Sequence, residues 1–472
     1  SIILVVGLNI NLHNYNGYLR RIRESMLDKN TDGSGSEANG RRAGVRRRDF
    51  LAATGAGAVA SVAGCIGGGG DDTITLGAVY LLSGVAEQLG SSSRAAAEVA
   101  IKEINENGGI LDSEIESDFR DHGEDPQGQM RSLVQEENAD IMLGLTSSGV
   151  TLNSGPTIEQ LGVPFTLTDI GTPFATEPDV DTYGNYYEDE GTAAAVDNLF
   201  RTNANTSINC YAIAKWINDN YGSARIANLG PDYAYGQQCW DYFKAYSEGL
   251  GADHEYVASA FPSLGASDMT PQINQVLDAE PDLLFTSFWA GDVVTFVQQA
   301  DEQGLFEEVD DVFDTIGADP NGFDALGETM PEGLHYSGWY WGSAFDNSEN
   351  DAFLEAYRNE HEDTDVIPYP SFTGGSSYAA VYVYKEAIEA AGSTDPDDII
   401  SEMEGMEFTG PRGTWTIDEE SHQASAPTVI GETSMDVDVP YDGVGLTNTE
   451  TYTLDRSTAE DLLSGSDLPP GI

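Results

Sequence analysis

The feature that most constrains the fold of this chain is an alternation of short apolar runs with longer amphipathic segments, which starts at Thr73. Thr73–Tyr80 (TITLGAVY) has the length and apolar content of a buried strand, and Ser91–Asn107 places its apolar residues at helical spacing. Gly108 and Gly109 follow, as is typical of a helix C-terminus. Such strand–helix alternation predicts a parallel sheet that is covered by helices on both faces.

The alternation occurs twice, and a chain of 472 residues exceeds what one hydrophobic core usually takes, so we expect two α/β units. The first series continues with Ile115–Asp121, Gln127–Asn138, Ile141–Gly144, Thr151–Leu161 and Val163–Thr168. The second series, after Phe200, comprises Ile208–Asn220, Ala224–Leu229, Gly236–Gly249, Glu255–Ala260, Met269–Leu277, Asp282–Phe288, Val293–Gln303 and Asp311–Ile316. The first unit is completed by later segments at Asp351–Glu360, Tyr378–Ala391 and Phe408–Asp418, so the chain is expected to cross between the units more than once.

Charge is distributed very unevenly along the chain. The 80 acidic and 21 basic residues give a net charge of −59, and residues 1–64 hold nine of the basic and five of the acidic residues. The rest of the chain therefore carries 12 basic and 75 acidic residues, a surface that repels nucleic acid and anionic lipid. In molar salt, where the Debye length is about 3 Å, that self-repulsion is screened. We therefore interpret the acidity as an adaptation to a halophilic environment.

An export signal precedes Cys65. Arg47-Arg48, followed by Asp49-Phe50-Leu51, resembles a twin-arginine signal, and a run of small and apolar residues leads from it to Cys65. That run is shorter than the roughly 20 apolar residues that a spanning helix needs. Val62-Ala63-Gly64-Cys65 resembles a lipobox, whose cysteine takes a diacylglyceryl group. We expect a lipoprotein that is exported by the twin-arginine route and anchored by Cys65 to the extracellular face of the cytoplasmic membrane.

These observations divide the chain into four expected parts. Residues 1–64 hold an upstream extension and the signal peptide, with Met26 as an ordinary start, and residues 65–72 form a Gly-rich tether. Lobe 1 is expected to comprise residues 73–199 and 345–425. Lobe 2 is expected to comprise residues 200–344 and 426–472.

Leu76–Leu111 resembles the opening of the branched-chain amino acid (Leu/Ile/Val-binding) family of ABC-transporter solute-binding proteins, with a strand, an L-S-G turn and a helix that ends in I-N-x-x-G-G-I. Gly144–Ser148 is similar to the G-x-x-S-S loop of that family, Thr168–Thr172 to its T-P-A-A-T segment, and Asp232–Gly236 to its Y-G turn. The resemblance implies the two-lobed α/β fold of type I periplasmic-binding proteins, with several hinge crossovers and a ligand enclosed between the lobes. It also implies an ABC permease and its ATPase as partners, and we expect a monomer.

A zwitterionic ligand needs donors for its carboxylate and an acid for its ammonium group. Ser147 and Ser148 lie between a strand and a helix N-terminus, where hydroxyls and free amides form an anion site; simple N-capping is the alternative. The resemblance places Thr172 at a threonine that contacts both ligand groups, with a turn residue as the alternative. It places Ile170 where a backbone carbonyl accepts from the ammonium group. It places Asp319 at the ammonium-binding acid, which is usually Glu, with a surface acid as the alternative.

Three further residues fall at positions that line the ligand side chain in the family. Tyr235 and Trp289 match two aromatic positions of the second lobe, and Leu89 falls where an aromatic residue often packs. Core packing is the alternative for all three. Trp289 in place of tyrosine, Leu89, and the short acid Asp319 together predict an altered pocket, suited to a larger or differently shaped apolar ligand.

We expect no catalytic residue, no cofactor and no metal site. The six histidines have no metal-ligand spacing, and the chain has no Gly-rich phosphate loop, G-x-S-x-G motif or His/Cys nucleophile pair. Cys210 and Cys239 are compatible with a disulfide or with two buried thiols. The leading hypothesis is therefore a lipid-anchored receptor that delivers a branched-chain or related amino acid to an ABC importer. The alternatives are a receptor for a short amide, urea or an aromatic acid, a sensory ligand-binding module, and a structural surface lipoprotein.

Overall fold

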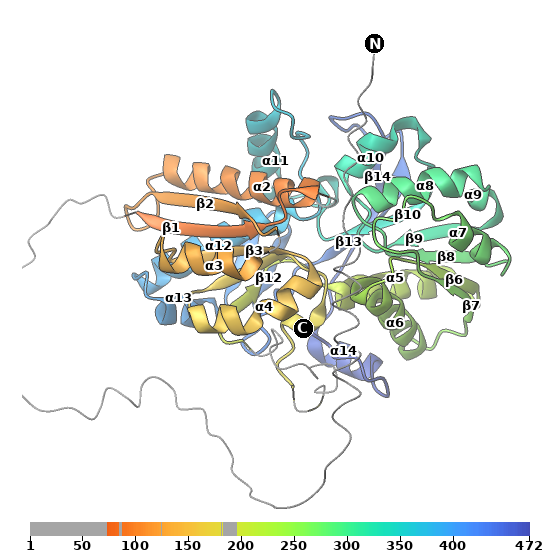
Figure 1. Cartoon of the computed structure of the whole chain (residues 1–472), viewed down its shortest axis with the longest axis horizontal. Helices are drawn as coiled ribbons and strands as arrows, with labels where there is room; N and C mark the ends of the chain where they lie inside the picture. The colour runs from red at the N-terminus through yellow and green to blue at the C-terminus, as the bar shows by residue number, and fades with distance from the viewer. Residues whose placement is uncertain (1–72, 85–86, 124, 181, 183–195) are drawn as a thin grey trace, which may run out of the picture. The chain divides into compact units, whose positions relative to one another are not determined.

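Two sheets built mainly of parallel strands form the frame of the protein (Figure 1). The computed structural model describes residues 73–84, 87–123, 125–180, 182 and 196–472, which all belong to one unit, Gly69–Ile472. The predicted extension, the export signal, the Gly-rich tether and Cys65 lie outside the described residues.

The first sheet has five parallel strands in the order β2-β1-β3-β4-β5. Its strands are β1 (Ile74–Tyr80), β2 (Ile115–Asp121), β3 (Ile141–Thr146), β4 (Phe165–Asp169) and β5 (Leu199–Arg201). Every residue of β3 and β4 is buried, as expected for parallel strands with helices on both faces. The connecting helices are α2 (Glu87–Glu106), α3 (Pro126–Gln135) and α4 (Ser148–Leu161).

A later part of the chain completes the core of this first sheet. It comprises α11 (Ser348–His361), α12 (Gly374–Ala391), α13 (Pro396–Met403) and the two-stranded hairpin of β11 (Glu407–Gly410) and β12 (Gly413–Thr416). Tyr384 and Trp415 from this part share one buried cluster with Ile74 and Leu143 of the sheet. We call the five-stranded sheet with these elements lobe 1.

The second sheet, the frame of lobe 2, has seven strands in the order β14-β13-β10-β9-β8-β6-β7. The parallel strands are β6 (Arg225–Leu229), β7 (Glu255–Ala260), β8 (Leu283–Thr286), β9 (Asp311–Asp314) and β10 (His335–Gly338). Two antiparallel strands, β13 (Thr428–Ser434) and β14 (Gly445–Tyr452), extend one edge. The helices of lobe 2 are α5 (Thr206–Asn220), α6 (Ala234–Gly249), α7 (Thr270–Leu277), α8 (Gly291–Glu302), α9 (Leu305–Glu308), α10 (Pro320–Leu326) and α14 (Arg456–Leu462).

The chain passes between the lobes in the segments that follow β5, β10 and β12. The first and last of these segments pair with each other, since the Arg201 amide donates to the His422 carbonyl at 3.0 Å and the Ala424 amide to the Arg201 carbonyl at 2.9 Å. The side chain of Gln423 adds a hydrogen bond to the Asn203 carbonyl at 2.7 Å. These observations confirm the predicted fold class of two α/β lobes joined by several crossovers. The predicted residue limits of the two lobes stay a prediction.

No helix in the described ranges has both the length and the apolar character that a bilayer-crossing helix requires.

Candidate ligand-binding site

The predicted site residues lie where the carboxyl ends of the two sheets face each other. In open α/β sheets, ligands bind at this edge because loops and helix N-termini converge there. Gly171, after β4 in lobe 1, lies against Tyr235 of lobe 2, whose ring would be 2.8 Å from a Cβ atom added at Gly171. Leu89 of lobe 1 belongs to the same buried apolar cluster as Tyr235, Trp339 and Phe372. The lobes are therefore in contact around the site.

The N-terminus of α4 provides the first half of the site. Ser147 is exposed and, within the described structure, makes no side-chain hydrogen bond that caps the helix. Ser148 is buried, and its Oγ atom accepts a hydrogen bond from the Thr172 amide at 3.1 Å. Because that bond uses only an acceptor lone pair, the Ser148 hydroxyl proton is free to donate. Serine donors and a positive helix end suit a carboxylate.

The turn Ile170–Thr172 provides the second part of lobe 1's contribution, and the buried residue Arg201 holds it. The Ile170 carbonyl accepts from Arg201 Nη1 and from Asn203 Nδ2 (2.9 Å), while the Thr172 carbonyl accepts from Arg201 Nη2 at 2.8 Å. Both acceptor positions of the Ile170 carbonyl are thus occupied by the chain itself. The Thr172 hydroxyl is buried and has no hydrogen-bond partner among the described residues.

Arg201 has no acidic partner in the described part of the chain, although it is completely buried. Burial lowers the pKa of its guanidinium group to about 9. A buried charge without a counter-ion costs free energy. Here the dipoles of the Ile170 and Thr172 carbonyls, which accept hydrogen bonds from Arg201, stand in for the counter-ion. The sequence reading missed Arg201, because an arginine after a short apolar run carries no signal that distinguishes it from a surface residue.

Aromatic residues of lobe 2 line the opposite wall. The Tyr235 hydroxyl hydrogen-bonds the Thr315 hydroxyl at 2.9 Å, and the Trp289 indole donates to the Tyr233 hydroxyl at 3.0 Å. The rings of Tyr233 and Tyr235 lie 5.9 Å apart. Tyr235 is buried and Trp289 is half-buried, whereas Leu89 is buried in the cluster between the lobes. The sequence reading named three of these four residues and missed Tyr233.

Asp319 caps the N-terminus of α10, and only one of its carboxylate oxygens is used in that role. Oδ1 accepts from the amide (2.8 Å) and the side chain (2.9 Å) of Asn321. Oδ2 is buried and has no partner within the described ranges, and burial raises the pKa of the carboxyl group. The residue is 3% exposed, so it is not the surface acid that was the alternative interpretation.

Asp314 organises the turn that leads to Asp319. Its carboxylate accepts from the amides of Ile316 (3.0 Å) and Gly317 (2.5 Å) and from the Thr286 hydroxyl (2.6 Å). Burial raises the pKa of this carboxyl group to about 6. Gly317 is needed here, because a Cβ atom would meet the Asp314 carboxylate at 2.6 Å and the Tyr336 ring at 2.8 Å.

Two further expectations concern cysteines and metals. Cys210 and Cys239 are free, buried thiols, and Cys210 Sγ donates to the Cys239 carbonyl at 3.3 Å. Among the described residues, no group of three or more His, Cys, Asp or Glu side chains could hold a metal ion.

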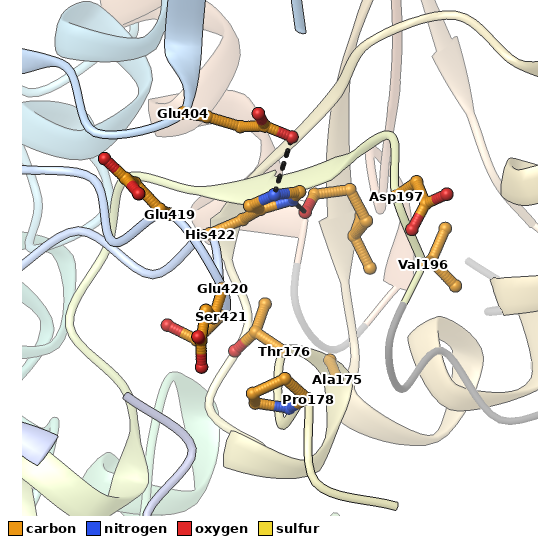
Figure 2. A pocket seen from close by; sticks show the side chains of 11 residues that line it. Ala175, Thr176, Pro178, Val196, Asp197, Glu404, Glu419, Glu420, Ser421 and His422 are labelled. Atoms are coloured by element: carbon orange, nitrogen blue, oxygen red, sulfur yellow. Dashed lines mark hydrogen bonds and ion pairs between the residues drawn. The ribbon is translucent and has the colours of Figure 1, made fainter. Parts of the chain in front are cut away.

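A separate pocket of about 330 Å³ lies near the end of η3 (Pro173–Ala175) and beside residues 419–422 of the last crossing segment (Figure 2). Its walls include the acids Asp197, Glu404, Glu419 and Glu420. His422 Nδ1 donates to the Leu199 carbonyl (3.1 Å), and its Nε2 atom lies 3.7 Å from Glu404. None of the predicted site residues lines this pocket. We therefore place the candidate site between the lobes, where the buried polar atoms are.

Comparisons with known proteins identify relatives of this chain. Residues 73–436 match the family described as "Periplasmic binding protein". The chain is 25% identical over 350 residues to "Leu/Ile/Val-binding protein homolog 3" of Brucella melitensis biotype 1, an alignment that covers 73% of this chain and 87% of the relative.

Two solved structures share the arrangement of the chain. An amino acid ABC transporter substrate-binding protein from Pseudomonas fluorescens Pf-5 superposes with a TM-score of 0.70 at 17% identity, over 82% of this chain and 98% of that one. An ABC-transporter solute-binding protein from R. palustris in complex with 4-hydroxybenzoate gives a TM-score of 0.67 at 19% identity, over 81% and 97%. At such identities the likeness shows the fold alone, and it confirms the predicted two-lobed type I periplasmic-binding fold.

Proposed function

The chain belongs to the periplasmic binding protein family, and we propose that it is the extracellular solute receptor of an ABC importer. In this role it binds an amino acid of the branched-chain or a related type between its lobes and presents it to a permease with an ATPase. The relatives of the chain are substrate-binding proteins of transporters and not enzymes, in agreement with the expectation from its sequence.

The observation that carries the proposal is the complementary chemistry of the two halves of the site. Lobe 1 offers the hydroxyls of Ser148 and Thr172 and the N-terminus of α4, all of which suit a carboxylate. Lobe 2 offers Asp319, whose buried Oδ2 atom has no partner among the described residues and suits an ammonium group. A zwitterion placed between the lobes satisfies both sets. Tyr235, Trp289 and Leu89 supply the apolar wall for its side chain.

An aromatic acid is the second candidate ligand. It is favoured by the wall of Tyr233, Tyr235 and Trp289 and by the solved relative that holds 4-hydroxybenzoate. An aromatic acid uses the carboxylate donors of lobe 1 in the same way. It carries no group that needs the charge of Asp319.

The test is a thermal-shift measurement in molar KCl with millimolar L-leucine, L-isoleucine, L-valine and 4-hydroxybenzoate. We expect a melting temperature that rises with the concentration of an amino acid, because a ligand that binds only the folded state stabilises it by mass action. Asp319→Ala should weaken amino-acid binding by about 2–4 kcal/mol, since it leaves the ammonium group unpaired. It should leave the binding of 4-hydroxybenzoate nearly unchanged.

The matched control is Asp395→Ala, because Asp395 also caps a helix, α13, but lies in an exposed position of lobe 1. This variant should bind like the wild type. If no amino acid shifts the melting temperature at any salt concentration, the amino-acid assignment is wrong.

We further propose that the receptor is a twin-arginine-exported lipoprotein of a halophile. The support is the order Arg47-Arg48, apolar run and Cys65, together with the net charge of −59. Cys65→Ser should release the protein from the membrane fraction, and replacing both arginines with lysine should keep it in the cytoplasm. The melting temperature should rise with KCl from 0.1 to about 2 M, as screening weakens carboxylate repulsion; a flat salt profile would contradict the halophilic interpretation.

A further inference from the structure

Asp169, the last residue of β4, is an acid of the site that no prediction from the sequence included. It pairs in the sheet with Thr146, the last residue of β3, and the Thr146 side chain hydrogen-bonds its carboxyl group. The residue is 7% exposed, and its Oδ2 atom has no hydrogen-bond partner in the described structure. It stands one residue before Ile170, so it precedes the turn that carries Thr172.

Gly171, two residues after Asp169, lies against Tyr235 of lobe 2, and the Tyr235 hydroxyl hydrogen-bonds Thr315, four residues before Asp319. Burial and, in addition, the charge of Asp319 raise the pKa of Asp169 well above its usual value. Besides burial, the charge of Asp169 helps to raise the pKa of Tyr233, the residue before α6. In the same way, the charge of Asp319 acts on Tyr357 of α11, in lobe 1. Each acid thus lies within electrostatic reach of the opposite lobe.

The described chain provides neither acid with a cation. Neither Asp169 nor Asp319 forms an ion pair with any described residue. Burial and the charge of Asp319 raise the pKa of Asp169, whereas the pKa of Asp319 is raised by burial and lowered by its hydrogen bonds from Asn321. The nearest buried guanidinium, Arg201, is directed at the carbonyls of Ile170 and Thr172. Tyr80 near Asp169 and Tyr441 near Asp319 stay neutral, because burial raises the pKa of both phenols. Two buried carboxylate oxygens thus remain without a counter-charge.

We propose that Asp169 and Asp319 form a two-carboxylate clamp, one acid from each lobe, that holds the positively charged nitrogen group of a small organic cation. The inference rests on the proposed function, since it places the ligand between the lobes, and it narrows the ligand class. The bound group carries at least two N–H donors, as primary ammonium, amidinium and guanidinium groups do, so that both Oδ2 atoms receive a hydrogen bond. Ligands without a cation, such as aromatic acids, leave the clamp unfilled.

The clamp also couples ligand binding to closure of the lobes. Without a ligand, closing the lobes over two ionised carboxyl groups is unfavourable, because burial raises the pKa of each, so the open arrangement is preferred whenever both groups are ionised. A cation between them reverses the sign of the interaction and stabilises the closed arrangement. The ligand therefore has the differential affinity for the closed state that a ligand-driven conformational change requires.

The first test needs no ligand. Spin labels on the two lobes report the distance between them, by pulsed electron paramagnetic resonance at pH 7.5 in molar KCl, for the ligand-free wild type, Asp169→Asn and Asp319→Asn. Each Asn variant removes one charge with little change of shape, so both should shift the distance distribution toward the closed form. Asp140→Asn is the control, because Asp140 is a half-buried acid that accepts from the Thr75 amide at the other end of the sheet. Unchanged distances in both site variants would overturn the proposal.

The second test uses matched probes in titration calorimetry. L-Leucine and 4-methylpentanoate share an apolar chain and a carboxylate and differ in the ammonium group. Leucine should bind at least ten times more tightly to the wild type, and Asp169→Asn should lose about tenfold or more of that affinity. Leucine binding that Asp169→Asn leaves unchanged and Asp319→Ala abolishes would refute the clamp and leave the proposed function intact. If no probe binds, the proposed function fails, and the lobe distances alone decide for or against the clamp.

Discussion

Buried charges of opposite character lie in two places between the lobes. On one side, Glu177 of lobe 1 is completely buried and pairs with Arg456 of α14 in lobe 2 at 2.7 Å. The Gly471 amide adds a hydrogen bond to Glu177 at 2.8 Å, and Arg456 also donates to the Ile472 carbonyl at 2.9 Å. In the candidate ligand site, Asp169 and Asp319 are both acidic and lack any partner cation among the described residues.

The difference shows what each arrangement can do. A desolvated carboxylate that meets an arginine is satisfied in the folded chain itself, so the Glu177–Arg456 contact between the lobes needs no ligand. We propose that the buried carboxyl groups of Asp169 and Asp319, which have no described cation beside them, stay ionised only when a cation from outside lies between them. The same physical cost of burying charge thus makes one contact structural and the other dependent on a ligand.

The largest effect on the free energy of unfolding is expected from breaking the Glu177–Arg456 ion pair. Arg456→Met keeps the aliphatic stem but leaves Glu177 buried and unpaired, which should lower the free energy of unfolding by about 3–5 kcal/mol. Urea unfolding at a fixed molar KCl concentration measures this loss in the free energy of unfolding. Arg94→Met is the control, because Arg94 pairs with Glu98 at 2.8 Å on the surface of α2 and should cost no more than about 0.5 kcal/mol. Equal losses in both variants would show that Glu177 does not depend on its partner.

A third buried carboxylate sharpens the comparison through its pH dependence. Burial raises the pKa of Asp314 to about 6 from an ordinary value of 3.8, so its stabilising contribution is complete below pH 3.8 and is lost as the pH rises through 6. The titration of Asp314 alone should lower the free energy of unfolding by up to about 3 kcal/mol between pH 4 and pH 7.5. Asp314→Asn should abolish this part of the pH profile, as measured by urea unfolding at a series of pH values.

The opposite sign is expected at Asp455, whose pKa is lowered to about 2 by hydrogen bonds from Ser457 and Thr458. Its contribution is present above pH 3.8 and is lost as the pH falls toward 2. Because this carboxyl group is exposed, Asp455→Asn should change the profile far less than Asp314→Asn. A larger change in Asp455→Asn would contradict the role given to burial.

The smallest effect on the free energy of unfolding is expected from substituting Asp169, an acid without a described partner cation. Asp169→Asn removes a buried charge that has no partner cation, so it should raise the free energy of unfolding of the ligand-free protein by about 1 kcal/mol at pH 7.5. Glu177→Gln replaces an acid with its amide in the same way as Asp169→Asn. It should lower the free energy of unfolding, since Arg456 then loses its charged partner. Differential scanning calorimetry of both variants in the absence of ligand tests the pair. A loss of stability in both would mean that Asp169 already has a counter-charge.

Much of the fold could be predicted from the sequence because local patterns determine buried parallel strands. The strands Ile115–Asp121 and Glu255–Ala260 have the bounds that the sequence predicted. The strands β13 and β14 were missed, since TVIGETS and GLTNTETY mix polar residues with few apolar ones, as strands toward the edge of an antiparallel pair can. The three-residue strand β5 is too short for any periodic signal.

The candidate site was predictable only in part. Ser148, Thr172 and Asp319 belong to segments that precede or begin helices, and the structure brings them to the facing edges of the sheets. Asp169 is one of 80 acidic residues, and nothing in its neighbourhood in the sequence distinguishes it from the acids of the surface. Its burial, and the absence of a described cation beside it, are properties of the assembled lobes.

The sequence by itself determined the alternation of strands and helices, the two α/β lobes, the acidic surface and the motif around Cys65. These follow from local spacing and composition, which act over a few residues at a time. Only the tertiary structure decided that Asp169 and Asp319, 150 positions apart, are both buried at the facing edges of the two sheets, while Glu177 meets Arg456. The reason is that parallel strands bring their carboxyl ends to one edge, and the crossings between the lobes turn the two edges toward each other.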